Sequence, residues 1–342
     1  MLLNLINLNK DHIDVVSEHI RRIIDMEGYK ILNISTEMKI CKLMIDKFRD
    51  SVKRLLKSGN IYKVFEELYK IFTVFSYVSD IDESIDTILK ILENYNIEKD
   101  FLEVCTQSNI QYLKNIVNKV KNVDFRNNAK VITEQLLTSR SCDKVFYKAR
   151  DLGIKDRIVH MMIYVIHNLL KDTEYELSNI DKVPPHVDIH NVKVLLRLGV
   201  LNFDRNILDR YVGSGRYFMR IIPICAKLAP DEVYKTVWEV LKRKSLDAIF
   251  EISKRVNIEP LVLSFYLSAI GKNYCIFNDD EKSSKHYCPI KELKTCPLST
   301  VCRTYVGLNS MLIFSRRQLR LLLKYLNAPK NVIENSCEVI VV

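Results

Sequence analysis

The segment IGKNYCIFNDDEKSSKHYCPIKELKTCPLSTVC, residues 270 to 302, contains four of the nine cysteines of the chain: Cys275, Cys288, Cys296 and Cys302. Thiolates gathered in this way in an intracellular chain bind metal more often than they form disulfides. Structural zinc sites usually use close C-x₂₋₄-C pairs, but the gaps here are twelve, seven and five residues. Wide and uneven gaps favour a [4Fe–4S] cluster, because a loop must wind around it to reach its corners. A zinc site in which His286 replaces one cysteine is the alternative.

Composition and charge set the outer limits. The 342 residues allow one large domain or two. No apolar run approaches the roughly eighteen residues of a membrane span, and the first residues do not resemble a signal peptide. We therefore expect a monomer without membrane contact in a reducing compartment, either the cytoplasm or the nucleoid or nucleus. The net charge of +10 fits a polyanionic partner, and nucleic acid, in particular DNA, is the commonest one.

Apolar periodicity predicts an all-α fold. Eight glycines and eight prolines are too few for a turn-rich sheet protein. Apolar residues recur at the i, i+3, i+4, i+7 spacing of a helix stripe in several segments, namely Ile13–Ile24, Met38–Leu56, Ile61–Phe75, Ile85–Ile91 and Ile154–Leu170. Gly28 and Gly59 follow two of these runs and are expected to end them. A single β-like stretch, Val339–Val342, closes the chain.

The distribution of prolines predicts a domain boundary near residue 183. All eight prolines follow that point, beginning with Pro184 and Pro185. Residues 1–182 read as an N-terminal helical region, and residues 183–342 read as a second region with shorter helices and more connections.

The second informative segment, VPPHVDIHNVKVLLRLG, covers residues 183 to 199. Asp188 stands at the N-cap position of a helix, and one interpretation is that it only caps this helix. Such a position also stabilises a negative charge. The other interpretation is therefore an ionised carboxylate that stabilises a cationic transition state or activates a nucleophile.

This segment resembles the V-D-x-H-x-x-R-V segment of the helix-hairpin-helix DNA glycosylases, the endonuclease III superfamily, and the match places the family's catalytic carboxylate on Asp188. Iron–sulfur members of that family carry a four-cysteine cluster after this segment that ends in C-P-x₄-C. The run from Cys296 to Cys302, CPLSTVC, is similar to that ending, and the run from Leu267 to Cys275 is similar to the helix before the first ligand. The resemblance covers about the C-terminal half of the chain, and the cysteine loop would be an expanded one.

The resemblance also implies a hairpin at about residues 150–170, with Leu152–Val159 as its turn and Gly153 as its one glycine. The hairpin of the family offers backbone N–H groups to a phosphate. Lys155 would then stand where bifunctional members keep a Schiff-base lysine, which attacks as a neutral amine and so needs a lowered pKa. A solvated lysine at a helix start is the alternative, and Lys148 is a weaker substitute.

Taken together, the resemblance implies two helical lobes, with the N-terminal helix packed on the cluster lobe. The implied activity is cleavage of the N-glycosidic bond of a damaged or modified base that is extruded from a strand, with or without AP lyase activity, and with the cluster as a structural element. Two alternatives remain: a non-catalytic iron–sulfur protein that binds nucleic acid, and an N-glycosidase that acts on modified nucleosides or nucleotides.

Other polar residues receive an expected role as well. Candidate phosphate contacts comprise a glycine-rich loop and a basic C-terminal helix: Gly213, Gly215, Arg216, Arg316, Arg317 and Arg320. His186 and His190 flank Asp188, and we expect them to pack or to stabilise the helix rather than to bind metal. We expect Trp238 in the core.

Overall fold

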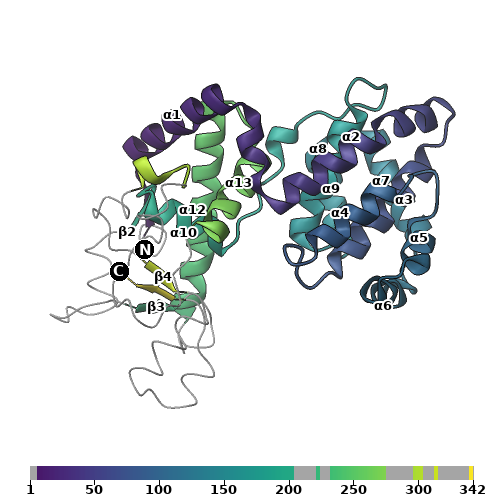
Figure 1. The fold of residues 1–342 in the computed structure, drawn as a ribbon. Helices are drawn as coiled ribbons and strands as arrows, with labels where there is room; N and C mark the ends of the chain where they lie inside the picture. Colours follow the sequence, from purple (N-terminus) through teal and green to yellow (C-terminus); the bar gives the residue numbers. More distant parts are fainter. Residues whose placement is uncertain are drawn as a thin grey trace, which may run out of the picture. The chain divides into compact units, whose positions relative to one another are not determined.

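The structure is a computed structural model that describes residues 6–203, 221–223, 232–274, 296–302, 312–314 and 339–341. The chain is mostly helical (Figure 1), as the periodicity predicted. It divides into two compact units. The terminal unit comprises Met1–Ile31, Val187–Ile258 and Tyr266–Val342, and the central unit comprises Leu32–His186 and Glu259–Phe265. The chain passes between the two units after residues 31, 186, 258 and 265, so each unit is built from more than one segment of the chain.

The central unit is built from helices that pack in pairs. Its α-helices are α2 (Thr36–Lys57), α3 (Ile61–Ser76), α4 (Ile85–Asn94), α5 (Phe101–Gln107), α6 (Gln111–Val120), α7 (Phe125–Ser139), α8 (Cys142–Asp151) and α9 (Asp156–Leu170). Short 3₁₀ turns cover Tyr29–Ile34, within which the chain passes from one unit to the other, and Ile180–Lys182. Helix α3 packs against α7, α2 packs against α9, and α8 packs against both α7 and α9. The apolar stripe of α3 is buried along its whole length, so the predicted periodicity marks a core helix.

Local capping chemistry sets where several of these helices begin. The Ser35 hydroxyl accepts a hydrogen bond from the Met38 N–H at 3.0 Å at the start of α2. Asp100 and Asp124 perform the same task for α5 and α7. Such caps satisfy N–H groups that have no partner within the helix. Gly28 follows α1 (Lys10–Glu27) and Gly59 follows α2, with φ of +71° and +76°, the left-handed region expected for glycines that end helices.

A buried ionic network joins α3 to α5. The Lys70 ammonium lies 2.8 Å from a carboxylate oxygen of Glu67 and 2.7 Å from one of Asp100. The second oxygen of Glu67 accepts hydrogen bonds from the Tyr95 hydroxyl at 2.9 Å and from the Phe101 N–H at 2.8 Å. Burial of these charges is tolerated because each one has a partner of opposite charge or a hydrogen-bond donor.

The terminal unit brings together segments from both ends of the chain. Its helices are α1 (Lys10–Glu27), α10 (Ile189–Arg197), α12 (Glu232–Val256) and the later turns of α13 (Pro260–Asn273), and a 3₁₀ turn, η5, covers Ser299–Val301. Helix α1 packs against α12 and contacts η5 (Figure 1). The Arg255 guanidinium lies 2.7 Å from the Asp14 carboxylate and joins α12 to α1.

Two small sheets complete the terminal unit. Strand β1 (Ile6–Leu8) pairs antiparallel with β2 (Leu201–Phe203). Strand β5 (Val339–Val341) lies between β3 (Ile221–Pro223) and β4 (Leu312–Phe314). The expectation of a single β-like stretch was therefore too low, because these three-residue strands are too short to produce a visible alternation. Within the described residues, no helix is both long enough and apolar enough to span a bilayer.

Candidate functional site

Asp188 occupies the N-cap of α10, as its position in the sequence predicted. One carboxylate oxygen, Oδ1, accepts hydrogen bonds from the N–H groups of His190 at 2.9 Å and Asn191 at 3.0 Å. The Asn191 side chain in turn accepts a hydrogen bond from the Asp188 N–H at 3.0 Å, which completes a capping box. Helix α10 is held in place by its apolar face, because Val192, Leu195, Leu196 and Leu198 are buried.

The second oxygen of Asp188 is held from another helix. The Ser268 hydroxyl on α13 donates a hydrogen bond to Asp188 Oδ2 at 2.7 Å. Both oxygens of the half-buried carboxylate are therefore oriented by donors, an arrangement that favours its charged form. Sequence reasoning missed Ser268, because its contact with Asp188 joins residues 80 positions apart.

A glycine allows α13 to come this close to α10. A Cβ added at Gly271 would lie 2.6 Å from the backbone oxygen of His190 and 2.7 Å from its Cβ. Gly271 and Ser268 are three positions apart and so share one face of α13. The close approach at Gly271 thus places Ser268 within reach of Asp188. His190 is partly buried at this contact, and burial lowers its pKa to about 4. The negative charge of Asp188 acts in the opposite direction but is the smaller effect.

Two of the four predicted cluster cysteines lie in the described residues. Cys296 and Cys302 flank the η5 turn, and both are buried. The Cys302 thiol lies 3.8 Å from the backbone oxygen of Arg197 on α10. The Pro297 oxygen lies 2.8 Å from His19 Nε2 on α1. Residues 296–302 of the cysteine loop are therefore tied to α1 and to the helix that Asp188 begins. Cys275 and Cys288 lie outside the described residues.

Residues 150–170, where the resemblance implies a hairpin, comprise the end of α8, a short turn and α9. Helix α8 ends at Asp151, and Gly153 adopts φ of +83° in the turn that leads to α9. Lys155 is the N-cap residue of α9, and its side chain is exposed and does not cap the helix. Lys155 and Gly153 belong to the central unit, whereas Asp188 belongs to the terminal unit.

The remaining expected nucleic-acid contacts lie outside the described residues: Gly213, Gly215, Arg216, Arg316, Arg317 and Arg320. The side chain of Trp238 is also outside the described set. The roles expected for these residues stay predictions.

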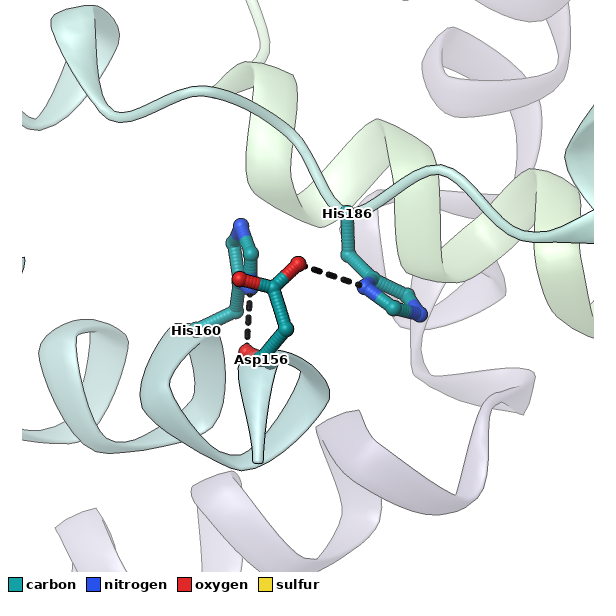
Figure 2. A group of neighbouring side chains, drawn as sticks. All are labelled: Asp156, His160 and His186. Carbon is teal, nitrogen blue, oxygen red and sulfur yellow. Dashed lines mark hydrogen bonds and ion pairs between the residues drawn. The ribbon is translucent and has the colours of Figure 1, made fainter. Parts of the chain in front are cut away.

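A second group of potential metal ligands lies in the central unit, and sequence reasoning did not assemble it. Asp156 and His160 lie one turn apart on α9, and His186 lies on the coil segment that passes beside them (Figure 2). One potential ligand atom from each residue lies within 4.8 Å of those of the other two. The Asp-x-x-x-His spacing in α9 was a visible signal, but the chain position of His186 gives no hint that it joins them.

Comparison with known proteins gives one partial similarity. An alignment of 190 residues at 30% identity relates this chain to the CRISPR-associated endoribonuclease Cas13a of Leptotrichia buccalis. It covers 51% of this chain and 15% of the length of that much larger protein. No family model matches the chain, and no solved structure matches it.

Proposed function

We propose that this protein is an N-glycosidase of the helix-hairpin-helix DNA glycosylase type, which releases a damaged or modified base from nucleic acid. The observation that carries the proposal is the setting of Asp188. This carboxylate caps α10 and is fixed by Ser268, and the same helix contacts Cys302 of the cysteine loop. The packing of α1 against α12 and the η5 turn further supports it, because the resemblance implies an N-terminal helix packed on the cluster lobe.

In the proposed reaction the bond between the base and the sugar C1′ breaks, and the base leaves with the electron pair. The negative charge of Asp188 stabilises the oxocarbenium-like sugar that forms. Water then adds at C1′ and gives up a proton, while the departing base gains one. In the lyase branch, the Lys155 amine attacks C1′ in place of water, the bond to the base breaks, and the amine loses a proton. The C1′–O4′ bond then opens, O4′ takes up a proton, and a protonated Schiff base remains between Lys155 and C1′. The base reaches the enzyme only after it has left the helical stack.

The cysteine residues fit an iron–sulfur cluster by their chemistry. Four thiolates are the usual ligands of a [4Fe–4S] cluster, and the two described thiols are shielded from solvent on either side of one turn. When bound, the cluster would cross-link the loop through Cys275, Cys288, Cys296 and Cys302. Its contribution is structural: it would hold the loop near α10. Protein purified without oxygen should then contain about four irons per chain, whereas stoichiometric zinc would favour the zinc alternative.

The decisive variant is Asp188→Asn. Asparagine caps a helix about as well as aspartate, so the fold should survive while the negative charge is lost. Base release in single turnover should fall by about 100-fold or more. Asp124→Asn is the matched control, because Asp124 is also an N-cap and accepts a hydrogen bond from the Asn127 N–H at 3.0 Å. Full activity of Asp188→Asn on a true substrate would show that Asp188 only caps α10 and takes no part in the reaction.

Lys155→Ala separates the two branches. If Lys155 is the nucleophile, borohydride traps wild-type protein on the substrate strand, and the alanine variant loses both the adduct and strand nicking. Lys148→Ala serves as the comparison for the weaker substitute. Base release without any adduct in wild type would assign the reaction to Asp188 and water.

The substrate panel distinguishes the rival functions. It contains modified bases in duplex DNA, single-stranded DNA, RNA and free nucleosides. The RNA arm is included because the similar protein is an endoribonuclease. Binding without base release would favour the non-catalytic protein, and activity confined to free nucleosides would favour the small-molecule N-glycosidase.

A further inference from the structure

The Asp156, His160 and His186 group has the donor set of a transition-metal site. Two imidazoles and one carboxylate are ligands typical of zinc and non-haem iron. Asp156 is the first residue of α9, and His160 follows one turn later on the same face. Figure 2 shows the Asp156 carboxylate between the two imidazole rings, whose centroids lie 5.5 Å apart.

The first argument for a cation is the environment of His160. Its Nδ1 lies 2.6 Å from the backbone oxygen of Asp156, and its Nε2 lies 2.7 Å from that of Pro184. Carbonyl oxygens only accept hydrogen bonds, and a neutral imidazole has a single N–H to donate. Whichever tautomer is present, one ring nitrogen directs its lone pair at an oxygen.

Protonation of His160 would resolve this conflict at a high cost. His160 is only 2% exposed, and its ring packs against that of Phe146 with the two centroids 4.7 Å apart. A metal ion bound at one ring nitrogen offers the other resolution, because it takes the place of the second proton while the facing carbonyl oxygen shifts aside.

The second argument is His186. Its Nδ1 is buried and makes no hydrogen bond to any described residue. The nearest carboxylate oxygen, Oδ2 of Asp156, lies 3.7 Å away, beyond hydrogen-bond distance. That separation suits two ligands of one ion, since zinc lies about 2.1 Å from each nitrogen or oxygen ligand. The Asp156 side chain is 45% exposed, which leaves a side open to solvent for entry of the ion and for a water ligand.

We propose that Asp156, His160 and His186 bind one divalent first-row transition metal ion, of the zinc or ferrous iron class. Magnesium and calcium are disfavoured, because they prefer oxygen ligands. The ion fastens the coil segment Pro184–His186 to the first turn of α9 within the central unit. This role does not depend on the glycosidase chemistry or on the cysteine loop.

The test is a titration of the full-length protein, purified without oxygen, with Co²⁺ and then with Zn²⁺ as competitor. Wild type should bind one Co²⁺ with d–d absorption and without thiolate-to-cobalt charge transfer, which separates this site from the cysteines. Zn²⁺ should displace the cobalt and raise the melting temperature.

Two ligand variants and a control accompany the titration. Asp156→Asn changes a partly exposed side chain, and His186→Gln changes a side chain on a coil segment, so the fold should survive. Each variant should weaken binding by about 100-fold or more. Asp151→Asn, an exposed aspartate at the end of α8, should titrate like wild type.

Three results would overturn the proposal: wild type binds no cobalt, its cobalt spectrum shows thiolate charge transfer alone, or His186→Gln binds as tightly as wild type. The first result would indicate that His160 carries a second proton and bridges the two carbonyl oxygens. None of these results depends on base release, so the metal site and the proposed glycosidase activity fail or survive separately.

Discussion

In Gly271→Ala, two effects of similar size act in opposite directions on the stability of the protein. Alanine in place of glycine inside a helix normally gains about 1 kcal/mol. Here the new Cβ would lie 2.6 Å from the His190 backbone oxygen and 2.9 Å from its carbonyl carbon. These are backbone atoms at the first turn of α10, so they cannot rotate away as the end of a side chain would. Helix α13 must therefore move, and overpacking of this kind costs about 1–3 kcal/mol.

The expected net result is a loss of about 0–2 kcal/mol in the free energy of unfolding. The same displacement should lengthen the 2.7 Å hydrogen bond between Ser268 and Asp188. Ser268→Ala removes that bond without any clash and should cost about 1.5–3 kcal/mol, because the acceptor is charged.

Urea unfolding of both single variants and the double variant measures these quantities. If Gly271→Ala acts by pulling Ser268 away from Asp188, the double variant should be less destabilised than the sum of the two single changes. A Gly271→Ala protein more stable than wild type would refute this reasoning, because the helix preference would then outweigh a contact that costs little.

Two further predictions concern buried charge. Lys70→Met leaves the Glu67 carboxylate buried without its cation and should lower the free energy of unfolding in urea by about 3–5 kcal/mol. Lys130→Met breaks only an exposed pair with Glu134 and should change stability by less than about 1 kcal/mol. Similar losses in the two variants would contradict the role of burial. Burial lowers the pKa of His190 from 6.5 to about 4, so the unfolded state binds more protons between these pH values. His190 should therefore contribute a loss of about 3 kcal/mol in the free energy of unfolding as pH drops from 7 to 4. His190→Gln should show a shallower loss over the same pH range, and equal slopes would assign the acid sensitivity to other groups.

The helices and their caps were predictable because each depends on residues within a few turns. The stripe of α3 and the cap of α10 by Asp188 follow from side chains three or four positions apart. The positive φ of Gly28 and Gly59 follows from their place after an apolar run. The short strands were not predictable in this way, because three residues cannot show a period of two, and β1 finds its partner nearly two hundred residues later.

The candidate site residues also fall into those that local sequence predicts and those that only tertiary contacts bring together. The sequence alone pointed to Asp188 and to the four cysteines. A helix cap is recognised from neighbouring residues, and the spacing of candidate ligands can be read directly from the sequence. It assigned His186 a packing role, and it did not include Ser268 at all. Tertiary structure brought His186 to Asp156 and His160, and Ser268 to Asp188. These contacts depend on which helix faces pack together and, for Ser268, on Gly271, which allows α13 to approach α10 closely. No pattern within a single helix carries that information, since the partner lies on another segment of the chain.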